Sequence, residues 1–383
     1  MLKKVIIISV NAFCLICFAV CLAISSSVIT PLRSQQANDL WAGQSGERFA
    51  QLSVFFSGSG GYDMNDVYSL RDSLDRTLRT DSFDVTGNRV LYTDAWSAEC
   101  EVSLLSERGP STIAKAIAVG GDFFLFHPLN LRSGSYLSPN DVMKDRVVLD
   151  EELAWRLFGA IDIAGFELML NDRPFIVAGV VSRESDFANS KAYTYDAGLF
   201  ITYDTLLNMT DGAAKIETYE IVLPNPLTGY ALTMLTEKVT DPNALIVENS
   251  TRFSLGNTFS RIGSFGERSM RQEAIKFPYW ENAALFAEDW VTLLLVLSLF
   301  FIAFPIICTI IYLVLIIRYL VRRSKKAVRH MIDEKDKRAY DKYILEQNET
   351  EDKGNEIEHI KAEAGETVYN VNEIIREVQD ETV

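Results

Sequence analysis

Two long apolar segments without a charged residue constrain this chain more than any other feature of its sequence. Residues 5–24 are interrupted only by Ser9 and Asn11, and residues 290–317 contain Pro305 but no charged side chain. At the rise of an α-helix, each segment is long enough to cross a bilayer. We therefore predict two transmembrane helices, the second of them kinked at its proline.

Basic residues flank both segments on one side only. Lys3 and Lys4 precede the first segment, and residues 318–330 hold six Lys and Arg and no acid directly after the second. Asp289 stands at the other end of the second segment. Because Lys and Arg concentrate on the cytoplasmic side of membrane helices, both chain ends are predicted in the cytoplasm and residues 28–289 outside it.

The same charges divide the chain into consecutive parts. In chain order we predict a cytoplasmic N-terminus at 1–4, a transmembrane helix at 5–24, a stalk at 25–48, an extracytoplasmic domain at 49–250, a stalk or pre-membrane helix at 251–289, a transmembrane helix at 290–317, a basic juxtamembrane segment at 318–332 and an acidic, mostly disordered cytoplasmic tail at 333–383.

Two alternatives concern the first apolar segment. A cleaved signal peptide would also begin with Lys3 and Lys4, but residues 5–24 exceed the usual apolar core of such a peptide, so we favour a retained helix. A lipoprotein anchor at Cys21 is disfavoured because Val20 precedes it instead of a glycine or alanine.

The charge balance excludes nucleic acid as a partner. The formal net charge is −15, residues 31–289 hold 36 acids against 22 bases, and residues 333–383 hold 16 acids against seven bases. Phosphate backbones need a basic face, and the one basic run is explained by the adjacent membrane helix.

The segment between the two apolar stretches carries no constellation typical of an enzyme. His127 is its only histidine and Cys100 its only cysteine, so neither a zinc site nor an internal disulfide of one chain is predicted there. The acidic runs at 141–145 and 150–152 are interpreted as caps and solvated faces, with a calcium site as the alternative. We predict a non-enzyme without catalytic residues, metal ligands or cofactor.

Residues 119–182 show the clearest local pattern. A short β-branched run at 146–149 predicts a buried strand, and Asp150 is a candidate N-cap of a helix that Gly159 ends. Two strands joined by a hairpin turn at 171–173 follow. The other predicted elements are strands at 49–57, 89–92, 101–106, 113–119, 199–202, 218–223 and 245–247, helices at 63–79, 204 onward and 228–239, and an exposed loop at 183–196.

These patterns also carry a family resemblance. The loop GGDFF, the strand and helix RVVLDEELAWRLFG and the hairpin NDRPFIVAGVV together resemble the MacB-like periplasmic core domain of FtsX-like ABC transporter permeases. The matching residues look structural, because they form strands, turns and a helix stop. They are Gly121, Asp122, Phe123, Phe124, Gly134, Leu153, Ala154, Leu157, Phe158, Gly159 and Gly179.

The resemblance implies an α+β extracytoplasmic domain of strand–helix–strand units plus a smaller subdomain, carried between two transmembrane helices. It also implies work with a separate ABC ATPase. This chain departs from the family in two ways. The family has four membrane helices where two are predicted here, and residues 318–330 read RYLVRRSKKAVRH instead of the family's ATPase-docking motif.

The sequence therefore favours a non-catalytic permease-like or accessory subunit of a bacterial ABC transporter complex in the cell (inner) membrane. Its expected partners are the membrane, a separate ABC ATPase and a full FtsX-like permease, and homo- and hetero-oligomers both stay open. The alternative is a membrane-anchored extracellular sensor or scaffold that signals through the acidic tail.

Overall fold

The computed structural model describes residues 2–57, 61–81, 83, 90–105, 111–193, 195, 197–264 and 275–380. Its strands are β1 (Phe49–Phe55), β2 (Thr93–Leu105), β3 (Thr112–Gly121), β4 (Asn130–Gly134), β5 (Arg146–Asp150), β6 (Glu167–Leu170), β7 (Arg173–Ser182), β8 (Gly198–Thr202), β9 (Thr218–Pro224) and β10 (Leu245–Glu248). Its α-helices are α1 (Leu2–Ile29), α2 (Ala37–Ala42), α3 (Met64–Thr80), α4 (Phe123–Phe126), α5 (Glu151–Phe158), α6 (Asn189–Ala192), α7 (Tyr203–Met209), α8 (Tyr230–Lys238), α9 (Leu255–Arg261) and α10 (Tyr279–Asp380).

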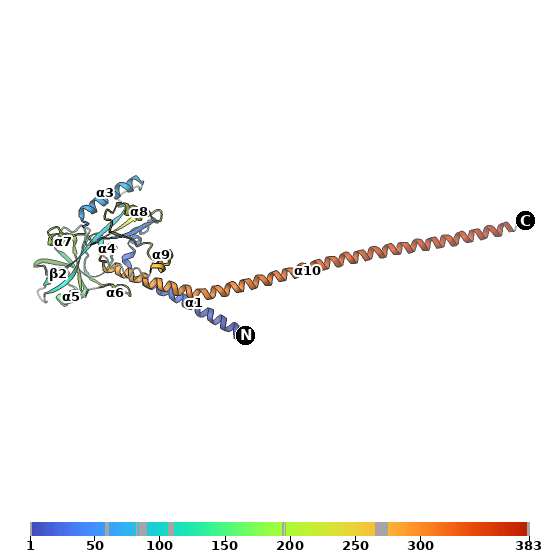
Figure 1. Ribbon diagram of the computed structural model, residues 1–383, viewed down its shortest axis with the longest axis horizontal. Helices are drawn as coiled ribbons and strands as arrows, with labels where there is room; N and C mark the ends of the chain where they lie inside the picture. The colour runs from blue at the N-terminus through green and yellow to red at the C-terminus, as the bar shows by residue number, and fades with distance from the viewer. Residues whose placement is uncertain are drawn as a thin grey trace. The chain divides into compact units, whose positions relative to one another are not determined.

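The described strands form one mixed sheet (Figure 1) in the order β10-β1-β9-β2-β3-β8-β5-β7-β4. β6 pairs with both β2 and β7. The paired strands β2, β3, β8, β5, β7 and β6 therefore form a closed ring. β3 pairs with β8 and β5 with β7 in parallel, while the other described pairs are antiparallel. Helix α5 lies in the crossover between β5 and β7, which is the predicted strand–helix–strand unit.

The sheet is buried on both faces, and its strands alternate between two cores. In β8, Leu199 and Ile201 belong to one buried cluster and Phe200 to the other. Val148 of β5 and Val222 of β9 face the second cluster in the same way. Because successive side chains of a strand point to opposite faces, each of these short apolar runs supplies both cores.

Helix α3, which the sequence predicts as a helix at 63–79, covers the first face of the sheet. Asp63 caps it and forms a capping box with Asp66. Its buried side chains recur at helical spacing and belong to the first core; they are Val67, Leu70, Leu74 and Leu78.

The predicted order of elements within residues 119–182 is confirmed. The Asp150 carboxylate accepts from Leu153 N at 2.7 Å, and Gly159 ends α5 with a left-handed φ of +66°. Asn171 and Asp172 form the two-residue hairpin turn with φ of +47° and +62°, values that Asn and Asp adopt more readily than most residues.

The segment after α1 differs from the predicted stalk at 25–48. Helix α1 ends at Ile29, before Pro31, and the chain then packs on the folded unit, burying Leu32 and Ala37. The buried Gln51 amide of β1 fixes this segment, since it accepts from Ala37 N at 2.8 Å and donates to Ser34 O at 2.7 Å. Only the residues up to Ile29 continue the helix.

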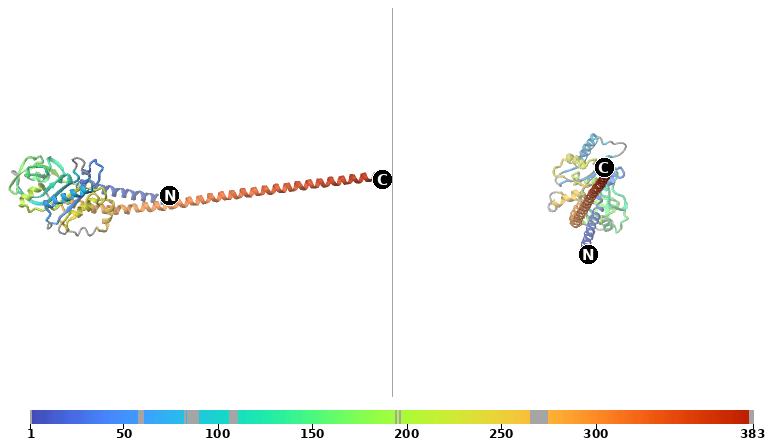
Figure 2. Two further views of the ribbon diagram at one scale, coloured as in Figure 1. Left: turned by 90° about the horizontal axis from the view of Figure 1, so that it is seen from above. Right: turned by 90° about the vertical axis from the view of Figure 1, so that its right-hand side faces the viewer.

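Helices α1 and α10 are both long and apolar enough to cross a membrane, over Lys4–Ile29 and Tyr279–Asn348. The chain divides into two compact units, Met1–Ala303 and Phe304–Val383. Within the first unit, Val28 of α1 and Val291 of α10 join the second core. The two helices leave the folded unit at the same end (Figures 1 and 2).

The C-terminal region also differs from expectation. The structure is helical up to Asp380, whereas the acidic composition predicted a mostly disordered tail at 333–383. The physical reason lies in the residue types, because this stretch has no proline and is rich in Glu and Lys, which are good helix formers. Arg338 pairs with Glu334 at i, i+4 spacing, which supports the helix further.

Three other predicted segments differ in the structure. No strand covers the described residues 90–92, and Arg89 lies outside the described residues. β2 is instead one long strand that includes most of the predicted strand at 101–106. The predicted exposed loop at 183–196 contains α6 and buries Ala188 and Asn189. Among the described residues of the predicted pre-membrane helix at 251–289, helix is present in α9, in the short 3-10 helix Ile262–Ser264 and from Tyr279 onward.

Gly134 offers a direct test of the β4–β7 packing. Its φ is +72°, and a Cβ there would lie 2.1 Å from Ala178 O. Gly134→Ala is expected to lower the free energy of unfolding by about 3 kcal/mol, from backbone strain and overpacking together. The measurement is the unfolding midpoint of the purified full chain.

Gly256→Ala is the matched control. Gly256 lies in α9 with nothing within 4 Å of its added Cβ, so the change should be neutral or raise stability by up to about 1 kcal/mol. Equal midpoints for both variants would contradict the close approach of β4 and β7.

Candidate functional site

The first turns of α10 are buried in the folded unit instead of lying at its surface. Tyr279 and Trp280 are 3% and 2% exposed, and Ala283, Ala284 and Ala287 are fully buried. Both aromatic residues therefore pack inside the folded unit. Small alanines let the helix approach the sheet closely, so the start of α10 is part of the second core.

Trp280 packs against a buried histidine–glutamate pair. The His127 ring lies 4.1 Å from the Trp280 ring and 4.5 Å from that of Phe123, measured between centroids. His127 Nε2 lies 2.5 Å from Glu220 Oε2, and the two side chains are 0% and 2% exposed. A ring so enclosed cannot contact a substrate, so its role is structural.

A series of hydrogen bonds leads from this pair to Arg252. Ser53 Oγ donates to Glu220 Oε1 at 2.9 Å, and Asn249 Nδ2 donates to Ser53 Oγ at 2.7 Å. Arg252 Nη1 then donates to Asn249 Oδ1 at 3.4 Å. All four side chains are buried, so these bonds form away from water.

Arg252 connects these bonds to α10. Its guanidinium binds Glu281 in a bidentate pair, with 2.7 Å from Nη1 to Oε2 and 2.5 Å from Nη2 to Oε1. Its Nε donates to Glu288 Oε1 at 2.5 Å, and Glu288 Oε2 also pairs with Arg261 of α9. Gln35 Oε1, from the segment after α1, accepts from Arg252 Nη1 at 3.1 Å.

Arg252, Glu281 and Glu288 are each 2% exposed. Removing ions from water is costly, and only good geometry with satisfied hydrogen bonds offsets that cost. Together with Arg261 the group holds two formal charges of each sign, so it is neutral as a set. We call the following residues the α10 anchor: Ser53, His127, Glu220, Asn249, Arg252, Arg261, Glu281 and Glu288.

Glu184 lies beside the anchor in a second polar group. Its carboxylate accepts from Tyr193 OH at 3.2 Å, and the Tyr193 ring stacks on Tyr279 with centroids 4.4 Å apart. Burial raises the pKa of Glu184, and Asp186 adds to this rise, while His127 and Tyr193 oppose it. The pKa of Tyr279 is also raised by burial, so its phenol stays protonated.

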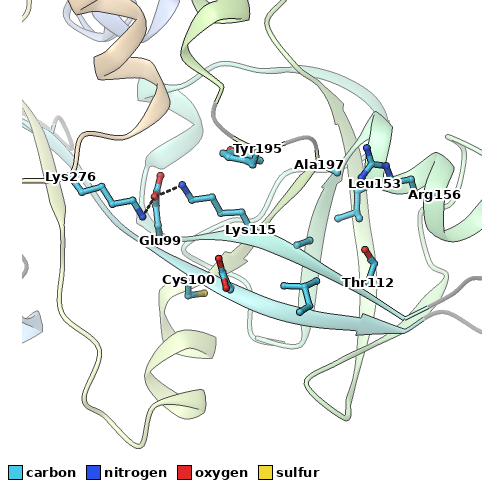
Figure 3. Close-up of a pocket in the computed structure, with 12 residues that line it drawn as sticks. Glu99, Cys100, Thr112, Lys115, Leu153, Arg156, Tyr195, Ala197 and Lys276 are labelled. Carbon is cyan, nitrogen blue, oxygen red and sulfur yellow. Dashed lines mark ion pairs between the residues drawn. The ribbon is translucent and has the colours of Figure 1, made fainter.

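A groove of about 610 Å³ lies on the β2–β3 hairpin (Figure 3). Lys115 and Lys276 point toward each other, and each Nζ lies 2.6 Å from Glu99 Oε2. Burial alone would lower the pKa of Lys276, but its hydrogen bond and ion pair with Glu99 raise it. Burial, with Glu217 and Glu99 nearby, raises the pKa of Cys100 to about 11, so its thiol is a poor nucleophile.

The two acidic runs that could have formed a calcium site are engaged in other contacts. Asp141 accepts from Ser138 N at 3.0 Å and pairs with Arg146 at 3.5 Å. Asp150 accepts from Gly198 N at 2.6 Å and from Arg183 Nε at 2.7 Å in addition to capping α5. Among the described residues, no group of three or more His, Cys, Asp or Glu has an arrangement suited to a metal ion.

The family-motif residues do not gather at one site. Gly121, Gly134 and Gly179 occur where a Cβ would lie within 3 Å of a neighbouring backbone oxygen. Asp122 accepts from Thr93 Oγ1 at 2.7 Å, and Phe123 is 2% exposed in the second core. Phe124 and Phe158 are partly buried against the two cores. Leu153, Ala154 and Leu157 form the buried face of α5, and Gly159 ends that helix. In the structure, these residues therefore lie in core packing, in close backbone contacts, at a hydrogen bond and at a helix end.

The sequence patterns did not reveal the charged part of the anchor. Arg252, Glu281 and Glu288 fall in the segment interpreted as a stalk, where charges are expected to be solvated. One signal was available, since Glu281 and Glu288 are seven residues apart and lie on one helix face together with Ala284.

The described unit is an α+β domain whose sheet holds the first turns of an apolar helix. A sequence model of the MacB-like periplasmic core domain matches residues 6–246, which is more than half of the chain. The chain belongs to this family. The resemblance found in the sequence is thereby confirmed, and so is the fold class.

Individual relatives are more distant. The macrolide export ATP-binding/permease proteins MacB of Neisseria gonorrhoeae and Neisseria meningitidis are 26% identical over 149 residues, or 38% of this chain. The chain spans 22% of the length of these relatives.

Among solved structures, the periplasmic region of MacB from Actinobacillus actinomycetemcomitans is 22% identical, covering 52% of this chain and 89% of its own, with a TM-score of 0.37. The extracellular domain of the noncanonic ABC-type transporter YknZ from Gram-positive bacteria is 12% identical over 51% of this chain and 99% of its own, with a TM-score of 0.36.

Arg252→Met tests the anchor. It leaves Glu281 and Glu288 buried without their main partner, so the free energy of unfolding should fall by about 3–5 kcal/mol. The matched control is Arg76→Met, which removes an exposed pair with Asp72 and should cost less than about 1 kcal/mol. Unfolding midpoints of the full chain in detergent measure both changes, and similar midpoints would contradict a buried ion group.

The raised pKa of Glu184 gives a pH dependence of defined sign. Because the folded state favours the protonated carboxyl, this group's stabilisation is present below its unfolded pKa and is lost as the pH rises through the folded pKa. Relative to the unchanged chain, Glu184→Gln should therefore be more stable at about pH 8 than at about pH 5. A difference in melting temperature that does not vary with pH would contradict the raised pKa.

Proposed function

We propose that this chain is a non-catalytic permease-like or accessory subunit of a bacterial ABC transporter complex, and that its sheet domain transmits motion to or from a partner. The single observation that supports this most is the α10 anchor. It joins the sheet, the segment after α1 and an apolar helix through buried, directional contacts.

The proposed topology follows from the charges that flank the two apolar helices. Residues 5–24 and 290–317 cross the membrane, and Lys3, Lys4 and residues 318–330 lie in the cytoplasm. The domain at 49–250 is then extracytoplasmic, which agrees with its membership of a periplasmic domain family.

The two helices join the domain differently, and this difference supports transmission through α10. α1 ends at Ile29, and the next residues form only short helical pieces. α10 instead begins inside the core at Tyr279 and continues as one helix into its apolar segment. A rotation or shift of that segment would act directly on Glu281 and on the sheet.

The proposed partners are a separate ABC ATPase and a full FtsX-like permease. Residues 1–383 contain no phosphate-binding motif of the form GxxxxGK followed by Ser or Thr, so we propose that a partner supplies ATP hydrolysis. The name of the Neisseria relatives combines ATP-binding and permease functions in one protein of which this chain spans a minor part.

Site-directed labelling tests the topology. In a chain whose five native cysteines are replaced by serine, Ser190→Cys in α6 and Ala339→Cys in α10 introduce single cysteines at exposed positions. A membrane-impermeant maleimide added to spheroplasts should label the first and should label the second only after the membrane is permeabilised. Labelling of Ala339→Cys in sealed spheroplasts would contradict the proposed orientation.

Purification from native membranes tests the function. The full chain should bring down an ABC ATPase and a permease, and Arg252→Lys should preserve that recovery while changing the ATP hydrolysis of the complex. A coupling free energy of about 1–3 kcal/mol corresponds to an effect of several-fold or more. A chain that is consistently recovered alone, from membranes where it is abundant, would overturn the transporter proposal.

The sensor alternative makes a different prediction for the acidic tail. If the chain signals through residues 333–383, deleting them should abolish activity while the membrane complex stays intact. If it is a transporter subunit, the same deletion should leave the ATP hydrolysis of the complex largely unchanged.

A further inference from the structure

A seven-residue spacing runs through the cytoplasmic half of α10. If Ile332 is placed at position d of a heptad, steps of alternately four and three residues lead to each following a and d position. These positions are Ile332, Asp336, Ala339, Tyr343, Glu346, Thr350, Lys353, Ile357, Ile360, Ala364, Thr367, Val371, Ile374 and Val378. Nine of the fourteen are apolar, and from Ile357 to Val378 only Thr367 is polar.

This spacing points to another helix as the partner. A straight α-helix has about 3.6 residues per turn, so a stripe repeated every seven residues drifts by about 20° per heptad. A flat surface would lose contact with such a stripe. Two helices that supercoil around one another keep it buried along its full length.

The stripe is open to solvent wherever the structure describes its side chains. Ile332, Tyr343 and Ile360 are 52%, 56% and 60% exposed. The unit Phe304–Val383 consists of this helix alone within the described residues, so it supplies no partner of its own. A long single helix gains little stability in water without packing of an apolar face.

We propose that residues 332–378 form a parallel coiled coil with a second copy of this chain. Insertion in the membrane favours a second copy as the partner. Two copies inserted in the same direction carry the segment the same number of residues beyond the same apolar span, so equivalent a and d positions meet without adjustment. This step requires α10 to cross the membrane as proposed above, but it requires no ATPase.

The charges beside the stripe agree with parallel pairing. In the same numbering Glu356 occupies a g position and Lys361 the following e position. In a parallel coiled coil the g residue of one helix lies next to that e residue of the other, so the two copies form this ion pair twice. The polar a and d positions from Glu346 to Lys353 weaken the middle of the seam and leave the apolar run from Ile357 as its main contact.

Disulfide cross-linking in native membranes tests the proposal. Ile360→Cys places a thiol at d, and Ala362→Cys places one at f, on the outer side; both positions are exposed. Ala339→Cys and Asp341→Cys form a second d and f pair three heptads earlier. Each variant is made in the full chain with the five native cysteines replaced by serine and is oxidised with copper phenanthroline.

Both d variants should give a covalent dimer at a rate at least about tenfold above their f partners, because d residues of two chains face one another in the seam. Equal cross-linking at d and f, or none at any position, would overturn the proposal. In a mixture of two differently tagged chains, a dimer between Ala339→Cys of one and Ile360→Cys of the other would overturn the parallel arrangement.

The outcome is independent of the transporter proposal. If the chain purifies without an ATPase yet cross-links at d and not at f, the coiled coil stands and the proposed function fails. If an ATPase is recovered and the d positions do not cross-link, the proposed function stands and the coiled coil fails.

Discussion

The bidentate ion pair between Arg252 and Glu281 is the contact on which the arrangement of this molecule most depends. It joins α10 to the chain that follows β10. The same guanidinium also contacts Glu288, which lies about two helical turns after Glu281. Alanines line the helix face that meets the sheet, and they restrict its rotation and height only weakly. The hydrogen bonds have fixed directions, so they select one rotation and one height of the helix.

A buried ion group is weak evidence for stability by itself. Apolar residues of the same volume often hold two elements together as well or better. What the charged group adds is a unique geometry, because the donors of Arg252 and Arg261 match the four carboxylate oxygens of two glutamates two turns apart. A helix that transmits motion to the sheet needs a contact with a fixed geometry, and not only one that holds the two elements together. The hypothesis of transmission through α10 therefore rests on this geometry more than on the amount of buried surface.

Local features of the fold could be predicted from the sequence, and long-range polar contacts could not. Asp150 as a cap, Asn171 and Asp172 in a turn, and the apolar stripe of α3 depend on residues within a few positions of one another. His127 and Glu220 are 93 residues apart, and Arg252 and Glu281 are 29 apart. Nothing local marks such charges as buried, so a segment rich in them is interpreted as a solvated stalk. The start of β2 was missed for a related reason, because Asp94 is charged yet buried there, and its partner Arg71 lies 23 residues away in α3.

The chain's two proposed contacts lie in different parts of α10, and that separation has a physical consequence. Within the folded unit, the anchor fixes the start of the helix at Glu281 and Glu288. Beyond the apolar segment, a seam from Ile332 onward would tie the helix to its equivalent in a second copy. Pro305 lies between them and removes one backbone donor, so it is the point in α10 where bending costs least. With both ends of α10 held, a change in the separation of two copies at the membrane has to be taken up at this proline or passed to the anchor. The anchor resists rotation through several directional hydrogen bonds, whereas Pro305 leaves only one helical hydrogen bond unformed. Small displacements should therefore be absorbed by bending at Pro305 and larger ones transmitted to the sheet.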